Sequence, residues 1–194
     1  MLGAIKHNLS NLTNFEGRDA RQTFWFYVLF LVIVQYAIGV VITAPMMDGM
    51  MQDAFRGASE GVSEGELHRQ MMRTMSGSLR NSIIASIVVS LLAAFCLLAS
   101  FVRRLHDSGR PGWIAAVAFV LVVASQAAAI ANMNTVLDAM MIADPGDPLA
   151  MMQAQRPLLM TGAFSWIGYL IVIVFGVWPS TPGPNRYGDE PARI

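Results

Sequence analysis

The chain has 194 residues, of which 55% are hydrophobic and only 13% are charged, and its mean hydropathy is +0.50. This composition excludes a disordered chain and is too apolar for an ordinary soluble domain, so an integral membrane protein is the first interpretation. The 13 basic and 13 acidic side chains balance, so the net charge gives no indication of a nucleic-acid partner.

The N-terminal arm, residues 1–22, is predicted to form an amphipathic helix that lies on the membrane surface. Its apolar side chains are three or four positions apart, which places them on one face of a helix, yet the arm is too polar to cross a bilayer. A solvated arm is the alternative. The apolar side chains are Leu2, Ile5, Leu9, Leu12 and Phe15.

Four stretches without a charged residue predict transmembrane helices. Each has about 19 to 21 residues, and at 1.5 Å per residue such a helix crosses the roughly 30 Å of hydrocarbon in a bilayer. They cover residues 24–44, 83–102, 113–131 and 161–179. The first stretch is too long for the apolar part of a typical secretory signal, so we expect it to be retained.

These stretches predict an all-α protein, an integral membrane four-helix bundle that forms a single domain over residues 1–194. Additional helices are expected outside the membrane. In the first outer connection, residues 45–82, Ser63 and Glu66 have the spacing of a capping box, which predicts a helix that begins there and continues into the second span. The pair Asp147 and Pro148 predicts a helix start in the second outer connection.

The distribution of basic residues predicts the orientation. Eight of the 13 Lys and Arg side chains lie in the N-terminal arm, in the short connection between the second and third spans, and in the tail, residues 180–194. The other five are spread over two longer connections. By the positive-inside rule, we expect both termini and the short connection to lie in the cytoplasm.

The short connection is the sequence RRLHDSGRPGW, residues 103–113. An arginine at mid-membrane costs about 2.5 to 3.5 kcal/mol, so the second span must end at Arg103 and Arg104. Asp107 can pair with either arginine at helical spacing, and Ser108 and Gly109 supply residues typical of a turn. The second and third spans are therefore predicted to be antiparallel neighbours.

Three blocks of sequence carry a family resemblance: GRDARQTFW at residues 17–25, RRLHDSGRPGW at residues 103–113 and GPNRYGDEP at residues 183–191. Together and in this order, they resemble the domain of unknown function 805 family, the YhaH-like bacterial inner-membrane proteins. The blocks bracket nearly the whole chain. The resemblance implies a small four-span protein of the bacterial cytoplasmic membrane and brings no established activity. We expect no cofactor.

Because all three blocks fall on the predicted cytoplasmic side, their side chains can meet on one face. Arginine pairs bidentately with phosphate or carboxylate, which lysine does not. We therefore expect a non-catalytic scaffold or regulatory subunit whose arginine-rich face contacts anionic lipid headgroups or a protein partner, which includes a second copy of this chain. The plainer alternative is that these residues only hold the protein in place through ion pairs. The candidate anion-binding residues are Arg18, Arg21, Arg103, Arg104, Arg110, Asn185 and Arg186.

An enzyme acting on lipids or phosphates is a second hypothesis. Such an enzyme would use His106 and Asp107 as acid, base or metal ligand. Adjacent residues on a helix point in different directions, and no nucleophile motif accompanies them, which weakens this interpretation. A channel or transporter would have only Gln35 and Gln126 as interior polar residues in the first and third spans.

The methionines suggest a third hypothesis. Of the 14 methionines, all except Met1 lie at or beyond the predicted outer edge of the membrane. Met71, Met72 and Met75 have helical spacing, and thioether sulfur is a soft ligand suited to Cu(I) or Ag(I). Apolar packing between outer helices, or against a partner, is the alternative role.

Overall fold

The structure, a computed structural model, describes residues 1–61, 63–142 and 148–191, with the side chains of residues 60–77 and 139–161 described only in part. The named elements in these ranges are all helices, which confirms the predicted all-α class. They are α1 (Leu2–Ser10), α2 (Arg21–Glu60), α3 (Glu64–Asp107), α4 (Trp113–Ile142) and α5 (Pro148–Val177).

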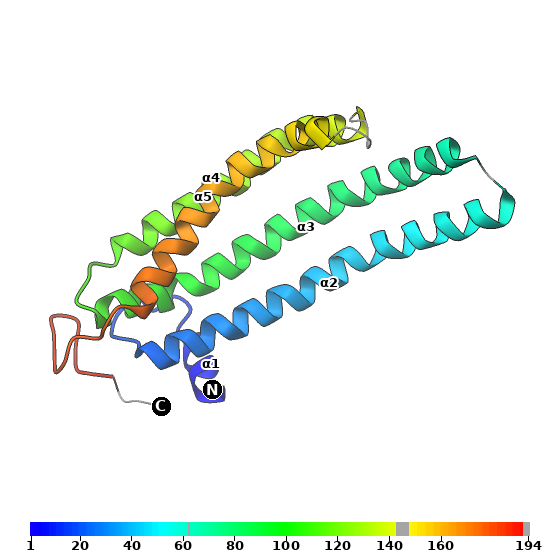
Figure 1. Cartoon of the computed structure of the whole chain (residues 1–194). Coiled ribbons are helices and arrows are strands. Elements are labelled where there is room, and N and C mark those ends of the chain that lie inside the picture. The colour runs from blue at the N-terminus through cyan, green and yellow to red at the C-terminus, as the bar shows by residue number, and fades with distance from the viewer. Residues whose placement is uncertain (62, 143–147, 192–194) are drawn as a thin grey trace.

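The four long helices form two antiparallel hairpins (Figure 1). The N-terminal arm, the turn between α3 and α4, and the segment that follows α5 gather at one end of the molecule, where α1 also lies. We call this the basic end and define it as residues 1–20, 103–112 and 178–191. The three sequence blocks therefore meet at one end, as expected if all three lie on the same side of a membrane.

Three of the helices are long and apolar enough to cross a membrane. The stretches that meet this criterion among the described residues are Arg21–Ser59, Ser78–Asp107 and Trp113–Asp138, and the fourth predicted span coincides with a shorter apolar stretch, Gly162–Val177. Large apolar side chains such as Val32, Tyr36 and Val41 are exposed along α2. An apolar exterior of this kind is expected of a helix that faces lipid rather than water.

The long helices are arranged in series. α2 packs along α3, α3 along α4 and α4 along α5, whereas α2 and α5 contact each other only slightly. The two outer helices approach at the basic end and separate away from it (Figure 1). These contacts do not confirm the predicted four-helix bundle.

The outer part of the first hairpin differs from the prediction. The first predicted span ends at Ala44, yet α2 continues through Pro45 to Glu60, and at about 1.5 Å per residue its 40 residues extend well beyond the roughly 30 Å of a bilayer core. Packing against α3 supports this extension, because a Cβ atom at Gly57 would lie 2.6 Å from the side chain of Leu67. The helices can approach closely only because this position has no side chain.

The predicted start of α3 is confirmed, although Ser63 makes no side-chain capping hydrogen bond. α3 begins at Glu64 with Ser63 as its N-cap and runs without interruption into the apolar stretch that ends at Asp107. α5 is described from Pro148 onward, and the predicted N-cap Asp147 lies outside the described residues. In the N-terminal arm the helix is shorter than expected, because α1 ends at Ser10 and does not include Leu12 or Phe15.

The buried apolar core lies next to the basic end. Its members come from α2, α3 and α4, and α5 covers them with partly buried side chains. This packing fixes the positions of the helix ends that carry the charged blocks. The core residues are Phe24, Phe101, Val102, Leu105, Ala115 and Ala118.

Candidate functional site

Asp107, the last residue of α3, lies at the centre of the basic end and is fully buried. Its Oδ1 atom accepts hydrogen bonds from Nε and NH2 of Arg18, at 3.1 and 3.0 Å. Its Oδ2 atom accepts from Arg104, one turn earlier on α3, and from Ser180 at 2.5 Å. One carboxylate therefore joins the N-terminal arm, α3 and the C-terminal segment.

Arg18 fixes the C-terminal segment to this carboxylate. Its NH2 group donates to the carbonyl oxygen of Thr181 at 2.7 Å, and its NH1 group donates to the carbonyl oxygens of Gly183 and Gly188 at 2.7 and 3.2 Å. Because all three guanidinium nitrogens are bound to protein acceptors, Arg18 also holds the loop between Thr181 and Gly188 in its shape. The side chain is almost completely buried.

Arg104 joins α3 to the end of α5. It pairs with Asp107 and donates to the carbonyl oxygens of Gly176 and Trp178, the first at 3.0 Å. These carbonyls belong to the last turn of α5 and the residue after it, where the helix leaves its own acceptors unused. A guanidinium group is suited to this position because its planar donors reach several acceptors at once.

A second buried ion pair involves Arg103 and Asp19. The Nε atom of Arg103 lies 3.1 Å from Oδ2 of Asp19, and the backbone amide of Asp19 donates to the carbonyl oxygen of Arg103 at 3.1 Å. Asp19 also accepts from Ser100 at 3.2 Å and faces His7 at 3.1 Å. The arm is thus attached to α3 through both side chain and backbone.

Arg103 also holds α1 in place. Its NH2 group donates to Oδ1 of Asn8 at 2.6 Å, and its NH1 group donates to the carbonyl oxygens of Asn11 and Asn14 at 3.0 and 2.5 Å. Asn8 is buried against this arginine, while Leu2 remains 82% exposed at the start of the helix. An apolar residue left exposed beside the charged end is what a helix at the membrane surface requires.

The five buried charged side chains Arg18, Asp19, Arg103, Arg104 and Asp107 form what we call the buried arginine network. It holds three guanidinium groups and two carboxylates, and thus has a formal net charge of one positive unit. Burying charges is costly unless each has a partner, and removing one partner from such a network costs more than the pair contributes. The buried arginine network therefore joins the three sequence blocks.

Three of the predicted arginines remain exposed: Arg21, Arg110 and Arg186. The guanidinium carbon of Arg110 lies 4.9 Å from the ring centre of Trp178, and that of Arg186 lies 4.6 Å from the ring centre of Tyr187. Arg21 is the first residue of α2. These cations are accessible to an anion outside the protein, in contrast to the buried arginine network.

Asn185, His106 and Tyr187 complete the contact between the turn and the C-terminal segment. Asn185 donates to the carbonyl oxygen of His106 at 3.0 Å and to the hydroxyl of Thr181 at 2.8 Å. The rings of His106 and Tyr187 are stacked, with centres 3.8 Å apart and planes inclined by 6°. Asn185 therefore bonds to protein, and His106 is covered on one face.

The residues proposed for the alternative functions are placed as follows. Asp107 is bonded to two arginines and a serine, so its oxygens are occupied. Gln126 donates to the hydroxyl of Ser90 at 3.0 Å, and Gln35 lines a cavity between the helices. The side chains of the proposed copper ligands lie outside the described residues; they are Met71, Met72 and Met75.

Sequence reasoning found part of this arrangement. The predicted pairing of Asp107 with Arg104 at a spacing of three is confirmed, whereas Arg103 pairs with Asp19 instead. Asp19 was not proposed, although it stands next to Arg18 in the first block. Ser180 and Thr181 were also missed; the only signal for them was a pair of hydroxyl residues directly after the last span.

In the described part of the chain, the elements are all helices, and three of them are long and apolar enough to cross a membrane. The buried arginine network joins the segments at the basic end. The chain belongs to the DUF805 family, whose members are described as proteins of unknown function, and the family model matches residues 12–189. This range includes the first two blocks and residues 183–189 of the third, so the family resemblance is confirmed. Comparison with curated proteins gave no match, and neither did comparison with solved structures.

Proposed function

We propose that this protein is a non-catalytic four-span protein of the bacterial inner membrane, with both termini in the cytoplasm, whose basic end binds anionic lipid headgroups. In this proposal the helix α5 supplies the fourth span, and the protein acts as a scaffold or regulatory subunit. The buried arginine network builds the basic end, and the exposed arginines contact the lipid.

The observation that carries the proposal is the division of the arginines into two groups. Arg18, Arg103 and Arg104 are buried and donate to protein oxygens, so they have a structural role. Arg110 and Arg186 are exposed, and each lies over an aromatic ring that limits the positions of its guanidinium group. Aromatic residues next to cations are typical of the headgroup layer, where the cations meet lipid phosphates.

The buried arginine network has a role in this function. If the arm, the turn and the C-terminal segment were separate, their arginines would be distributed over three mobile segments, and ordering them on a lipid would cost conformational entropy. The buried ion pairs fix the segments in advance. A lipid phosphate would then meet a preformed cationic surface.

Native mass spectrometry of the full chain released from detergent micelles tests this proposal. Wild type is supplied with equal amounts of phosphatidylglycerol and phosphatidylcholine that have identical acyl chains. We expect wild type to retain the anionic lipid preferentially, and the double variant Arg110→Gln, Arg186→Gln to lose most of this preference, because each basic side chain near a membrane surface contributes about 1 kcal/mol to the binding of anionic lipid. Arg56→Gln is the control, since Arg56 is exposed at the far end of α2. Equal preference in the double variant and in wild type would contradict the proposal, and the same spectra would reveal a protein partner or a second copy of the chain.

A further inference from the structure

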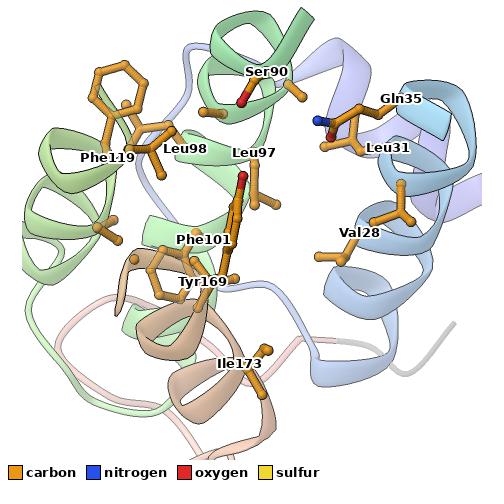
Figure 2. Close-up of a pocket in the computed structure, with 18 of the residues that line it drawn as sticks. Val28, Leu31, Gln35, Ser90, Leu97, Leu98, Phe101, Phe119, Tyr169 and Ile173 are labelled. Atoms are coloured by element: carbon orange, nitrogen blue, oxygen red, sulfur yellow. The ribbon is translucent and has the colours of Figure 1, made fainter. Parts of the chain in front are cut away.

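An apolar cavity of about 620 Å³ lies between α2 and α5 (Figure 2). α3 and α4 form its floor, and it exists because α2 and α5 approach only at the basic end. Its volume is in the range of sites that enclose a small-molecule ligand, roughly 300–1,000 Å³. The space opens between α2 and α5, and an apolar surface of this size is expected to be covered by another apolar molecule.

The floor of the cavity combines alanines with larger apolar side chains. Ala94 on α3 and Ala115 and Ala118 on α4 face the space with no more than a methyl group. A Cβ atom at Gly168 on α5 would lie 3.1 Å from the carbonyl oxygen of Ala118, so α4 and α5 are in close contact there. The alanine side chains are too short to fill this space, so the space results from the packing of the helices.

At the lower end of the cavity, α2 and α5 contact each other. The indole of Trp25 donates to the carbonyl oxygen of Gly176 at 3.2 Å, and the same oxygen accepts from Arg104 at 3.0 Å. A Cβ atom at Gly176 would lie 2.8 Å from Phe24, so the two helices touch at this level. The cavity thus begins directly above the buried arginine network.

The upper end is marked by polar side chains. Gln35 and Ser90 line this end, and the labelled side chains between them and Ile173 are mostly apolar (Figure 2). On α2 the wall runs from Trp25 to Gln35, and ten residues of helix cover about 15 Å. That length is about half of the roughly 30 Å hydrocarbon core and matches a single leaflet. A lipid chain fits this length, whereas a transmembrane helix would need a groove through both leaflets.

The positive charge at the lower end of the cavity favours an anionic lipid. Arg21 is exposed and lies on the same face of α2 as Trp25, Val28 and Val32, because these positions follow one another at spacings of three and four. No ion pair involves Arg21 in the part of the chain that the structure describes. Together with the net positive charge of the buried arginine network, Arg21 would attract a negative group at the level where the cavity ends.

We infer that the cavity holds an acyl chain of an anionic phospholipid whose phosphate is bound by Arg21. The lipid enters from the leaflet on the side of the basic end, through the opening between α2 and α5. This inference rests on the proposed function and deepens it, since it adds one specific lipid site to a general headgroup surface. The bound chain fills the space between the two outer helices, which touch each other only near the basic end.

Native mass spectrometry with the same two lipids tests this site. Arg21→Gln is expected to lower the ratio of retained phosphatidylglycerol to phosphatidylcholine about fivefold, the equivalent of one lost surface cation. Ala94→Phe and Val32→Phe fill the cavity from its floor and from its mouth, and each is expected to reduce the retention of both lipids. Controls are Arg56→Gln and Ala124→Phe, because Ala124 is exposed on α4 and outside the cavity wall.

The outcomes separate this inference from the proposed function. Thermal unfolding confirms that each variant is folded, and Val32→Phe decides the matter if Ala94→Phe does not fold, since Val32 is 55% exposed. A folded cavity-filling variant that retains lipid as wild type does would overturn the inference, as would an unchanged lipid ratio in Arg21→Gln. If the Arg110→Gln, Arg186→Gln variant still loses its preference in that case, the proposed function stands without the cavity site. Identification of the molecule that leaves with the purified wild type completes the test: an anionic phospholipid supports the inference, and a neutral isoprenoid contradicts it.

Discussion

Arg18 and Asp107 are 89 positions apart in the sequence, yet two guanidinium nitrogens of Arg18 lie 3.0 and 3.1 Å from one oxygen of Asp107 in the buried interior. This pair connects the segment that precedes the first long helix to the end of the second. Because Arg104 and Ser180 share the same carboxylate, the contact also includes the C-terminal segment. The basic end is thus a single folded unit and not three independent tails.

The carboxylate of Asp107 is expected to be necessary for this unit. Asp107→Asn leaves two buried guanidinium groups without their common anion, and the loss of one partner from a buried pair costs about 3–5 kcal/mol. The free energy of unfolding in detergent should fall by this amount. Asp189→Asn is the matched control, because Asp189 is exposed in the C-terminal segment. Equal stability of the two variants would show that the buried arginine network contributes little to the free energy of unfolding.

The position of Arg104 should require a guanidinium group. Arg104→Lys keeps the positive charge but cannot reach Asp107 and the carbonyl oxygens of Gly176 and Trp178 together. We expect the free energy of unfolding to fall by about 1–3 kcal/mol, the cost of leaving buried acceptors unpaired. The exposed Arg186→Lys should change it by less than about 0.5 kcal/mol. Thermal unfolding of both variants measures the difference, and full stability of Arg104→Lys would be the opposing result.

Arg103 should control the order of the N-terminal arm. Arg103→Met removes the donors to Asn8, Asn11 and Asn14. Hydrogen exchange of the backbone amides in α1 is expected to become about tenfold faster or more, since hydrogen bonds of charged groups contribute about 1.5–3 kcal/mol each. Arg110→Met is the control because Arg110 is exposed. Unchanged exchange in α1 would mean that the arm is held by other contacts.

Two glycines of α5 should respond in opposite ways to a methyl group. A Cβ atom at Gly176 would lie 2.8 Å from Phe24 and 3.0 Å from Trp25, whereas nothing lies within 4 Å of one at Gly162. Gly176→Ala is expected to lower the free energy of unfolding by about 1–3 kcal/mol, because it overpacks the contact between α2 and α5. Gly162→Ala should leave it unchanged or raise it by about 0.5–1 kcal/mol, as alanine favours the helix. Thermal unfolding of both variants measures these changes. A loss of stability in Gly162→Ala as large as that in Gly176→Ala would contradict the contact between α2 and α5.

Much of the helical structure follows from local sequence. The apolar stretches, the start of α3 after Ser63 and the turn after Asp107 depend on periodicity and residue type within a few positions. The start of α3 and the turn are confirmed, and three helices among the described residues are long and apolar enough to cross a membrane. The pairing of Arg104 with Asp107 belongs to the same class, because a spacing of three places both on one face of a helix. The length of α2 is the exception, since the helix continues through Pro45, a residue that usually interrupts a helix, to Glu60.

The pairings between distant segments could not be predicted in the same way. The sequence places Arg18, Asp19, Arg103 and Asp107 on the same side of the membrane, but it does not determine which carboxylate faces which arginine. That choice depends on the rotation of α3 against the arm, which the burial of Phe24 and its neighbours sets.

The proposed topology requires that the turn between α3 and α4 and the C-terminal segment share a compartment opposite to the tip of the α2–α3 hairpin. A Cys96→Ser background with a single added cysteine tests it, at Arg110, Asp189 or Ser59, all of which are exposed. With a membrane-impermeant maleimide on intact spheroplasts, Ser59→Cys should be labelled at once, and Arg110→Cys and Asp189→Cys only after permeabilisation. Labelling of Arg110→Cys and Asp189→Cys from opposite sides would contradict the account.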